Sequence, residues 1–528
     1  MIDTASLCKF FWTSLLGMNM SVLSHRGRGR ALYEEIKARV LDGTYGPNAP
    51  LPSTRACAAE RGLSRTTVSA VYEQLAAEGF IETRPGGSSR VAAGANSAGV
   101  VANTMRAPDR HHNRHIRPRL SAFGERVAEL KLSSTGTPPP GYVDFMYGPL
   151  AGGDFPTLAW MKASRQVDRE RPDRLAYKDP RGDLRLRQAL QSYVARARGI
   201  SCTPDQLVIV NGSQQALDLC ARLLLNPGDK VAVENPGYRM AHHVFSAAGA
   251  RLHGIEVDQQ GLKTDSLRRV RNAAFAYVTP THQFPLGSFL AMPRRQSLLK
   301  WAAQTGAWIL EDDYDSEYRY AVRPVPTLQS LDENGAVIYI GTFSKTLSPE
   351  LRLGYMIVPN QLVDTFASAK QLADRHAPSK AQRTLAVLLE EGSYDRHVRR
   401  IRRLQDTRRT ALLAALERHL PGRLTVEGAS SGLHLVAWLQ GLPCAREPDV
   451  VAAARHERVL VYPVAPLFLP EGGRQSTRRS AGLLLGYALL NPEQIERGVK
   501  RLATAIRRMG QLNGHALASG SPRAKNDP

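Results

Sequence analysis

The sequence is poor in cysteine and has no long apolar run. Its 528 residues include five cysteines, far apart and without a CxxC pair or other metal-ligand spacing: Cys8, Cys57, Cys202, Cys220 and Cys444. This excludes a disulfide-framework protein and a cysteine-based metal centre, so we predict no metal site and a reducing, cytoplasmic location. No stretch approaches the roughly 20 apolar residues that a membrane-spanning helix needs, so we expect no membrane partner.

Acidic residues are scarce relative to basic ones. The chain has 48 Asp and Glu against 70 Lys and Arg, which gives a net charge of +22 and a pI near 10.0. This balance favours a polyanionic partner, because each basic side chain that binds a phosphate releases condensed counterions. The length allows two or three domains.

Residues 27–91 have the pattern of three helices followed by a two-stranded wing. Apolar residues at helical spacing predict the first helix: Leu32, Ile36, Val40 and Leu41. Ser53 caps a short second helix and Gly62 ends it; Ser64 then caps a third helix, which runs to about Glu78. Such a pair of helices forms a helix-turn-helix, whose second helix reads DNA through its first residues. Those residues are Ser64, Arg65, Thr66 and Thr67.

The segments LPSTR, LSRTTV and GFIETRPGG make residues 26–92 resemble the GntR-type winged helix-turn-helix domains. The resemblance implies a double-stranded DNA operator as partner, contacted by five residues: Arg55, Arg65, Thr66, Thr67 and Gly87. Residues 1–25 are then an N-terminal extension, expected to be disordered. Part of it, residues 9–23, faintly resembles a signal peptide, but a DNA-binding domain directly behind it argues against export, and Met18 and Met20 are alternative starts.

Two later segments, residues 307–318 and 336–355, each begin as a short apolar run and break into polar residues, as buried parallel strands do at their ends. In an open α/β sheet, ligands bind at such strand ends. The first strand end offers carboxylates: Glu311, Asp312, Asp313 and Asp315. The second offers Lys345 among hydroxyl groups and an arginine: Thr342, Ser344 and Arg352.

These groups match the needs of pyridoxal 5′-phosphate. The lysine amine can form a Schiff base with the aldehyde, a carboxylate can keep the pyridine nitrogen protonated, and hydroxyls with an arginine can hold the phosphate. Upstream, the strand Leu207–Val210 runs into Gly212 and a helix beginning at Ser213, and a helix N-terminus is an anion site. A further strand ends near Tyr238.

From about residue 138 to 509 the chain resembles the fold-type I aminotransferases, and its segments EDDYDSEYRY and GTFSKTLSPELRLGY are closest to the MocR-type regulators. The resemblance implies that Lys345 is the catalytic Schiff-base lysine, that Asp312 pairs with the pyridinium, that Tyr314 bonds the ring oxygen and that Tyr238 stacks on the ring. It assigns the phosphate to Ser213, Gln214, Thr342, Ser344 and Arg352. It also implies a homodimer with a head-to-tail arrangement, in which Tyr177 reaches the partner's phosphate.

We therefore expect an α/β protein in which the winged helix-turn-helix is joined by a linker to a fold-type I, aspartate aminotransferase-like large domain with a small α+β C-terminal subdomain. The Gly-, Ser- and Arg-rich residues 93–138 predict a flexible basic linker. The aminotransferase-like domain is predicted over 139–509, with its small subdomain beginning near Ala381. A disordered tail follows at 510–528.

Two functions remain open. The chain is either a transcriptional regulator that senses a small amine, an amino acid or pyridoxal phosphate without physiological turnover, or a working aminotransferase with a DNA-binding appendage. Two departures from the enzymes favour the regulator. Leucine stands at residues 483–485, where an arginine that binds the substrate carboxylate is expected, although Arg478 and Arg479 lie just upstream. His282 and Gln283 occupy a segment that reads Asn-Pro-x-Gly in the enzymes.

Overall fold

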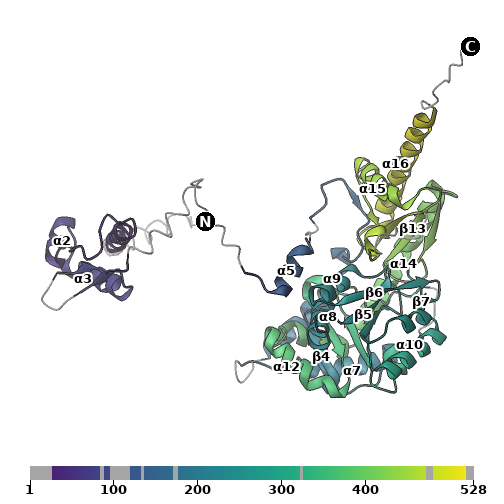
Figure 1. The fold of residues 1–528 in the computed structure, drawn as a ribbon, viewed down its shortest axis with the longest axis horizontal. Helices are drawn as coiled ribbons and strands as arrows, with labels where there is room; N and C mark the ends of the chain where they lie inside the picture. Colours follow the sequence, from purple (N-terminus) through teal and green to yellow (C-terminus); the bar gives the residue numbers. More distant parts are fainter. Residues whose placement is uncertain are drawn as a thin grey trace, which may run out of the picture. The chain divides into compact units, whose positions relative to one another are not determined.

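The computed structural model describes residues 27–83, 88–95, 119–132, 136–170, 176–320, 325–470 and 480–518. The chain divides into two compact units, Met1–Pro118 and Arg119–Pro528, which are described separately (Figure 1). The predicted N-terminal extension and the wing tip with Gly87 lie outside the described residues. Among the described helices, none combines the length and the apolar character needed to cross a membrane.

The first unit has the predicted three helices and two strands. A helix over 27–41 is followed by α2 (Thr54–Arg61) and α3 (Arg65–Ala77), and β1 (Ile81–Glu82) pairs antiparallel with β2 (Arg90–Val91). The Ser53 hydroxyl accepts a hydrogen bond from the Ala56 amide, and Gly62 ends α2 in the left-handed conformation. The core packs around side chains from all three helices: Leu32, Ile36, Val40, Cys57, Ala58, Val68, Val71 and Leu75. The predicted caps therefore begin and end these helices, and the residues at helical spacing form the core.

An eight-stranded sheet is the centre of the second unit. Its order is β4 (Leu207–Val210), β11 (Gly354–Ile357), β10 (Val337–Thr342), β9 (Trp308–Asp313), β8 (Ala273–Val278), β5 (Lys230–Asn235), β6 (Arg251–Asp258) and β7 (Gly261–Leu262). Neighbouring strands from β10 through β6 are parallel, and β11 and β7 run antiparallel to their neighbours. The predicted α/β class is confirmed.

Helices cover both faces of this sheet, because successive side chains of a buried strand point to opposite faces. On one face Leu310 and Ile340 pack with α8 (Ser213–Leu224), α9 (Arg239–Ala247) and α12 (Val363–Asp374). On the other face Ile309 and Val337 pack with α10 (Met292–Thr305). There Ile209 and Tyr339 pack with α7 (Leu184–Arg198) and α13 (Ser379–Glu390).

A smaller sheet forms the C-terminal subdomain. Its antiparallel order is β12 (Leu424–Glu427), β13 (His434–Leu439), β16 (Ala481–Gly486) and β15 (Tyr462–Pro463). Its core includes α14 (Ser393–His419), α15 (Glu447–His456) and α16 (Pro492–Ala518). An upstream strand, β3 (Val143–Asp144), pairs with β14 (Val459–Leu460). The subdomain begins with α14 rather than near Ala381, because α13 packs into the core of the large domain.

Two predicted boundaries differ from the structure. Part of the predicted linker forms α5 (Ala122–Glu129), which the hydroxyl of Ser121 caps. This helix packs on α9, where Arg126 Nε donates to the carbonyl of Ala247 at 2.8 Å. The Arg-rich composition predicted a flexible segment, although Ser121 is a helix cap and apolar residues follow it at helical spacing. At the other end α16 continues beyond Met509 into the predicted tail as far as Ala518, and the rest of that tail lies outside the described residues.

Candidate functional site

The predicted site segments meet at one edge of the large sheet. In the parallel pair β9–β10, Asp312 lies opposite Ile340, so the acidic run and the Lys345 loop leave the sheet side by side. On the other side of β10, β11 pairs with β4, where Gly354 lies opposite Val210, directly before the turn into α8. Strand order therefore brings three separate parts of the sequence together, as expected for a ligand site at carboxyl strand ends.

Lys345 is held in a protein environment rather than in open solvent. Its Nζ donates to the carbonyl oxygen of Gly148 at 2.9 Å. Gly148 has φ +107°, and a Cβ there would lie 3.2 Å from Nζ, so glycine allows this close approach. Burial lowers the pKa of Lys345, and the charges of Asp315 and Asp312 oppose the shift. A lowered lysine pKa leaves more neutral amine for attack on an aldehyde.

Asp312 has one free oxygen. It is 4% exposed, and its Oδ2 accepts a hydrogen bond from the Tyr277 hydroxyl at 2.7 Å. Its Oδ1 is buried and has no partner among the described residues. Burial raises the pKa of Asp312 to about 7, against the effect of the Tyr277 hydrogen bond. A protonated pyridine nitrogen at Oδ1 would satisfy this orphaned atom and favour the ionised carboxylate, so the residue fits pyridoxal phosphate.

The predicted phosphate residues surround the start of α8. Ser213 and Gln214 are its first residues, and no side chain caps its N-terminal Gly212. The Arg352 guanidinium donates to the carbonyl of Asn211 at 2.8 Å, and a Cβ on Gly212 would lie 2.6 Å from it. Free amides and an arginine therefore converge on one turn, which suits an anion.

Thr342 and Ser344 complete this group on the Lys345 loop. The Thr342 hydroxyl accepts a hydrogen bond from the Ser344 amide at 3.1 Å, which fixes the start of the loop. Behind the turn, Asp374 of α12 accepts hydrogen bonds from Asn211 at 2.6 Å and Gln215 at 2.8 Å. Sequence reasoning missed Asp374, which lies about 160 positions downstream of the turn it holds.

The three predicted tyrosines have different surroundings. Tyr238 precedes α9 and meets Phe284 edge to face, with ring centroids 5.7 Å apart. The Tyr314 hydroxyl lies 2.9 Å from Nδ1 of His282. Tyr177 is 76% exposed, and its ring lies 6.1 Å from that of His376. The exposure of Tyr177 suits a side chain that reaches another subunit.

The other carboxylates of the acidic run have structural partners. Glu311 accepts hydrogen bonds from the backbone amides at the start of α11 (Leu328–Leu331). Asp313 pairs with Arg198 at 2.7 Å, and Asp315 lies 2.9 Å from Nδ1 of His282. The sequence alone offered all four carboxylates, and all four are buried. Asp312 differs in that its hydrogen-bond partner among the described residues is a tyrosine hydroxyl rather than a cation, an imidazole or a backbone amide.

The leucine segment at 483–485 forms the middle of β16. Leu483 and Leu485 point into the core of the small subdomain. Leu484 points the other way, into an apolar cluster that includes Phe284 and is packed by Tyr238 and Tyr314. An apolar side chain therefore stands next to the predicted cofactor residues. Arg478 and Arg479 lie outside the described residues.

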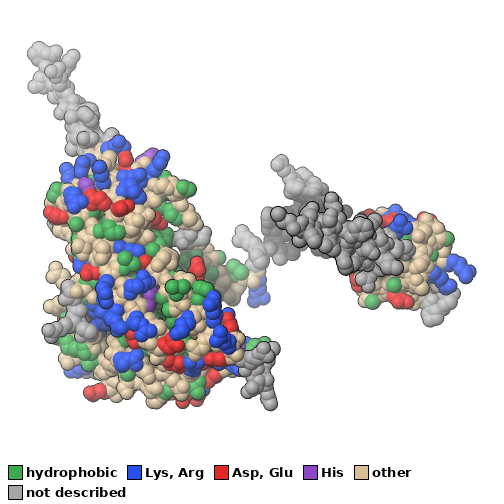
Figure 2. Space-filling model, turned by 180° about the vertical axis from the view of Figure 1, so that it is seen from behind, with side chains coloured by type: hydrophobic (Ala, Val, Ile, Leu, Met, Phe, Trp, Pro, Cys, Tyr) green, Lys and Arg blue, Asp and Glu red, His purple; other side chains and the backbone are tan. Residues whose placement is uncertain are grey.

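The predicted DNA-contacting residues lie at the start of α3 and on α2. Arg55, Ser64, Arg65 and Thr66 are exposed. Thr67 is half-buried: its hydroxyl lies 2.7 Å from that of Ser64, and its methyl group packs against Gly29. The geometry therefore points to the exposed side chains rather than Thr67 for base contacts. Lys and Arg side chains are visible on the surface of this unit in Figure 2.

We expect Arg65→Ala to weaken specific operator binding without changing cofactor content. Arg65 is the first residue of α3 and is exposed, and one base contact is worth about 1–3 kcal/mol. A mobility-shift titration at fixed salt measures the loss. The matched control is Arg61→Ala at the end of α2, because that guanidinium is bound by Glu35 at 2.8 Å. Equal affinities for the wild type and Arg65→Ala would place the contact elsewhere.

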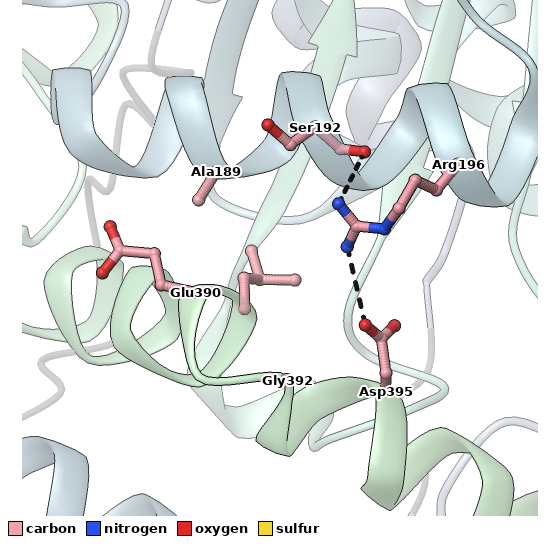
Figure 3. A pocket seen from close by; sticks show the side chains of 7 residues that line it. Ala189, Ser192, Arg196, Glu390, Gly392 and Asp395 are labelled. Carbon is pink, nitrogen blue, oxygen red and sulfur yellow. Dashed lines mark hydrogen bonds and ion pairs between the residues drawn. The ribbon is translucent and has the colours of Figure 1, made fainter.

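A cavity of about 470 Å³ opens between α7 and the junction of α13 with α14 (Figure 3). Its lining includes Arg196, which forms an ion pair with Asp395 at 3.5 Å across the opening. Glu390 at its edge is bound by Arg185. None of the predicted cofactor or DNA residues lines it, so it is separate from the site at the strand ends.

Comparison with known proteins agrees with this geometry. Residues 28–91 match the family described as bacterial regulatory proteins, gntR family, and residues 147–502 match aminotransferase class I and II. The chain is 36% identical to the probable rhizopine catabolism regulatory protein MocR of Rhizobium meliloti, over 90% of this chain and 93% of that protein. The chain belongs to the MocR-type transcriptional regulators. The assignment confirms the predicted fold, the DNA-binding regulatory function and pyridoxal phosphate as cofactor.

Other relatives of this MocR-type regulator include both regulators and enzymes. It is 30% identical to the pyridoxine biosynthesis transcriptional regulator PdxR of Corynebacterium glutamicum, over 81% of this chain and 86% of that protein. Among solved structures it resembles the α-aminoadipate aminotransferase LysN of Thermus thermophilus, complexed with N-(5′-phosphopyridoxyl)-L-leucine. The TM-score is 0.66 and the identity 30%, over 74% of this chain and 98% of LysN.

Proposed function

We propose that this MocR-type regulator holds pyridoxal phosphate at Lys345 and changes its operator affinity when the site binds its effector. The effector is pyridoxal phosphate itself or a small amine whose acid group is not the usual α-carboxylate. When bound, the cofactor supplies an aldehyde for amines and an electron-withdrawing ring. The chain would hold it through the following residues: Asp312, Tyr314, Tyr238, Ser213, Gln214, Thr342, Ser344 and Arg352.

The observation that carries this proposal is the position of Leu484. Its side chain packs with Phe284 beside Tyr238 and Tyr314, where a substrate carboxylate would need a cation. A carboxylate placed against these apolar groups would lose its hydration without gaining a partner. An unpaired, desolvated charge costs several kcal/mol, so ordinary α-amino acids are poor ligands for this site.

A specific observation also favours a second candidate, an active aminotransferase. Lys345 has a lowered pKa, and Asp312 has a free oxygen, which together provide the groups for proton transfer at the cofactor. The chain is 30% identical to the 2-aminoadipate transaminase of Thermus thermophilus, over 73% of this chain and 96% of that protein. Binding of an α-carboxylate is what separates the two candidates.

We expect transamination of ordinary α-amino acids to be slower than about 1 per second, the low end for enzymes. The reason is the missing cation at Leu484. Stopped-flow and steady-state assays with a 2-oxo acid acceptor would measure the rate. Amines without an α-carboxylate serve as the matched comparison, since they avoid the unpaired charge. Turnover of α-amino acids at ordinary enzymatic rates would contradict the regulatory proposal.

The proposed assembly is a homodimer in the cytoplasm with a head-to-tail arrangement. Its support is Tyr177, which is 76% exposed and which the family resemblance assigns to the partner's phosphate. Sedimentation of the full chain with and without pyridoxal phosphate tests this. A monomer at micromolar concentration with full cofactor content would contradict it.

One experiment tests the proposed signal directly. Purified protein is titrated with pyridoxal phosphate and then with candidate amines, while cofactor absorbance and operator affinity are followed together. We expect operator affinity to change over the same ligand concentrations as absorbance. Saturation of the absorbance with constant operator affinity would mean that the domain binds the cofactor but does not sense it.

A further inference from the structure

A buried histidine–carboxylate pair lies directly behind Tyr314. Nδ1 of His282 is 2.9 Å from Oδ2 of Asp315 and 2.9 Å from the Tyr314 hydroxyl. His282 and Asp315 are each 2% exposed. The predicted roles of the site residues do not include this contact. His282 lies in the segment where the enzymes carry Asn-Pro-x-Gly.

We infer that His282 and Asp315 are positioning residues that orient the Tyr314 hydroxyl so that its proton is directed to the ring oxygen of the cofactor. The inference rests on the proposed cofactor site and deepens it. A single ring nitrogen cannot both donate to Asp315 and accept from Tyr314. Which of the two it does determines where the tyrosine proton points.

The surroundings of the imidazole select the tautomer. An ionised Asp315 accepts a hydrogen bond, so the proton of neutral His282 belongs on Nδ1. The opposite nitrogen, Nε2, has no partner within the described residues, and a proton there would be buried without an acceptor. Glycines close off that edge, because a Cβ on Gly287 would lie 2.9 Å from Nε2 and one on Gly432 2.7 Å from it.

With the proton on Nδ1, the Tyr314 oxygen can only accept from this ring. Its own proton is then free for another acceptor, and the ring oxygen of the cofactor is the one that the site proposal provides. An asparagine in the enzymes would donate to that oxygen directly. Here His282 occupies the same segment, residues 282–285 (HQFP), and acts on the cofactor through Tyr314 instead.

Other ionisable groups surround this trio and are part of its electrostatic environment. Burial raises the pKa of Asp315, and its contact with His282 opposes this shift. Burial also lowers the pKa of His434, whose ring lies 5.2 Å from that of His282, to about 3. The further groups that act on the trio are Asp312, Asp313, Glu317, Glu234, Lys345, Tyr147, Tyr320 and Tyr487.

The test is the pH titration of bound-cofactor absorbance in a double-mutant cycle. A hydrogen bond to the ring oxygen draws electron density from it and weakens its hold on the proton shared with the lysine nitrogen. Losing one such bond, worth about 1 kcal/mol, should raise the absorbance midpoint by about 0.5–1 pH unit. We expect Tyr314→Phe and His282→Leu each to raise it, and the double variant to match Tyr314→Phe alone.

Two further variants keep the test decisive. Asp315→Asn preserves shape and removes the charge, and should shift the midpoint in the same direction by a smaller amount. His419→Leu is the control, because it removes a different histidine–carboxylate pair, with Glu496 at 2.7 Å, between α14 and α16. It should leave the midpoint unchanged.

The outcomes separate this inference from the proposed function. A wild-type protein that gives no lysine-linked absorbance with pyridoxal phosphate would overturn the site proposal itself. Normal wild-type absorbance with unchanged midpoints in His282→Leu and Asp315→Asn would overturn only the positioning role. An equal shift from His282→Leu in the Tyr314→Phe background would show that the histidine acts independently of Tyr314, and would also overturn it.

Discussion

Lys345→Ala is expected to abolish the absorption band of lysine-linked pyridoxal phosphate while the protein stays folded. Only a primary amine can form this linkage, and the Nζ of Lys345 lies at the strand ends beside the charges of Asp312 and Asp315. The substitution removes one partner of a hydrogen bond to the Gly148 carbonyl, a loss of about 1 kcal/mol. Absorbance spectra and thermal unfolding of the same samples measure both effects.

The proposed phosphate-binding residues remain in Lys345→Ala, so weaker, non-covalent cofactor binding should persist. Lys380→Ala is the matched control. Its amine is 60% exposed and paired with Asp168, and its loss should leave the absorption band intact. A Lys345→Ala protein with the wild-type band would show that another amine forms the linkage.

Arg198→Met should destabilise the second unit by about 3–5 kcal/mol. The guanidinium is 6% exposed and pairs with Asp313 at 2.7 Å and with Glu317 at 2.5 Å. Removing it leaves two buried carboxylates without their cation. The control is Arg196→Met on the same helix, whose arginine is 58% exposed and pairs with Asp395, and we expect a loss of at most about 1 kcal/mol. Urea unfolding at neutral pH compares the two variants.

The pH dependence of unfolding adds an independent readout. Burial would raise the pKa of Asp313, but Arg198 and the Tyr339 hydroxyl keep it below the usual aspartate value. A depressed carboxyl pKa gives stability that is present above the unfolded-state pKa and is lost as pH falls through the folded-state pKa. Without Arg198 that contribution is absent, so the variant should lose less stability than the wild type on acidification. Parallel acid profiles would contradict this account.

Sequence reasoning predicted the strand ends at which the candidate site residues lie. Short apolar runs placed Asp312 and Lys345 after two strands, and a glycine turn placed Ser213 at a helix start, because these signals are local. In the first unit the caps Ser53 and Ser64 were equally clear. The linker and tail boundaries differ from the structure, since Ser121 caps α5 within the Arg-rich linker and α16 continues as far as Ala518.

Partners that are distant in sequence could not be predicted in this way. Gly148 precedes Lys345 by 197 positions, and no local pattern marks it as the carbonyl that receives the amine. Tyr277 reads as an ordinary strand residue, yet its hydroxyl binds Asp312. Which carboxylate of the acidic run pairs with a hydroxyl rather than with a cation or a backbone amide depends on packing across several elements. The HQFP segment did signal His282, but its contact with Tyr314 required the fold.

Helix α9 links the cofactor site to the beginning of the second unit. Tyr238 stands at its N-terminal end, and the carbonyl of Ala247, its last residue, receives the hydrogen bond from Arg126 of α5. Nine residues at about 1.5 Å each make a stiff rod of roughly 13 Å. The boundary between the two units, after Pro118, lies only a few residues before α5. A ligand that displaces the Tyr238 end of α9 would therefore also move the carbonyl of Ala247, to which Arg126 of α5 is bound.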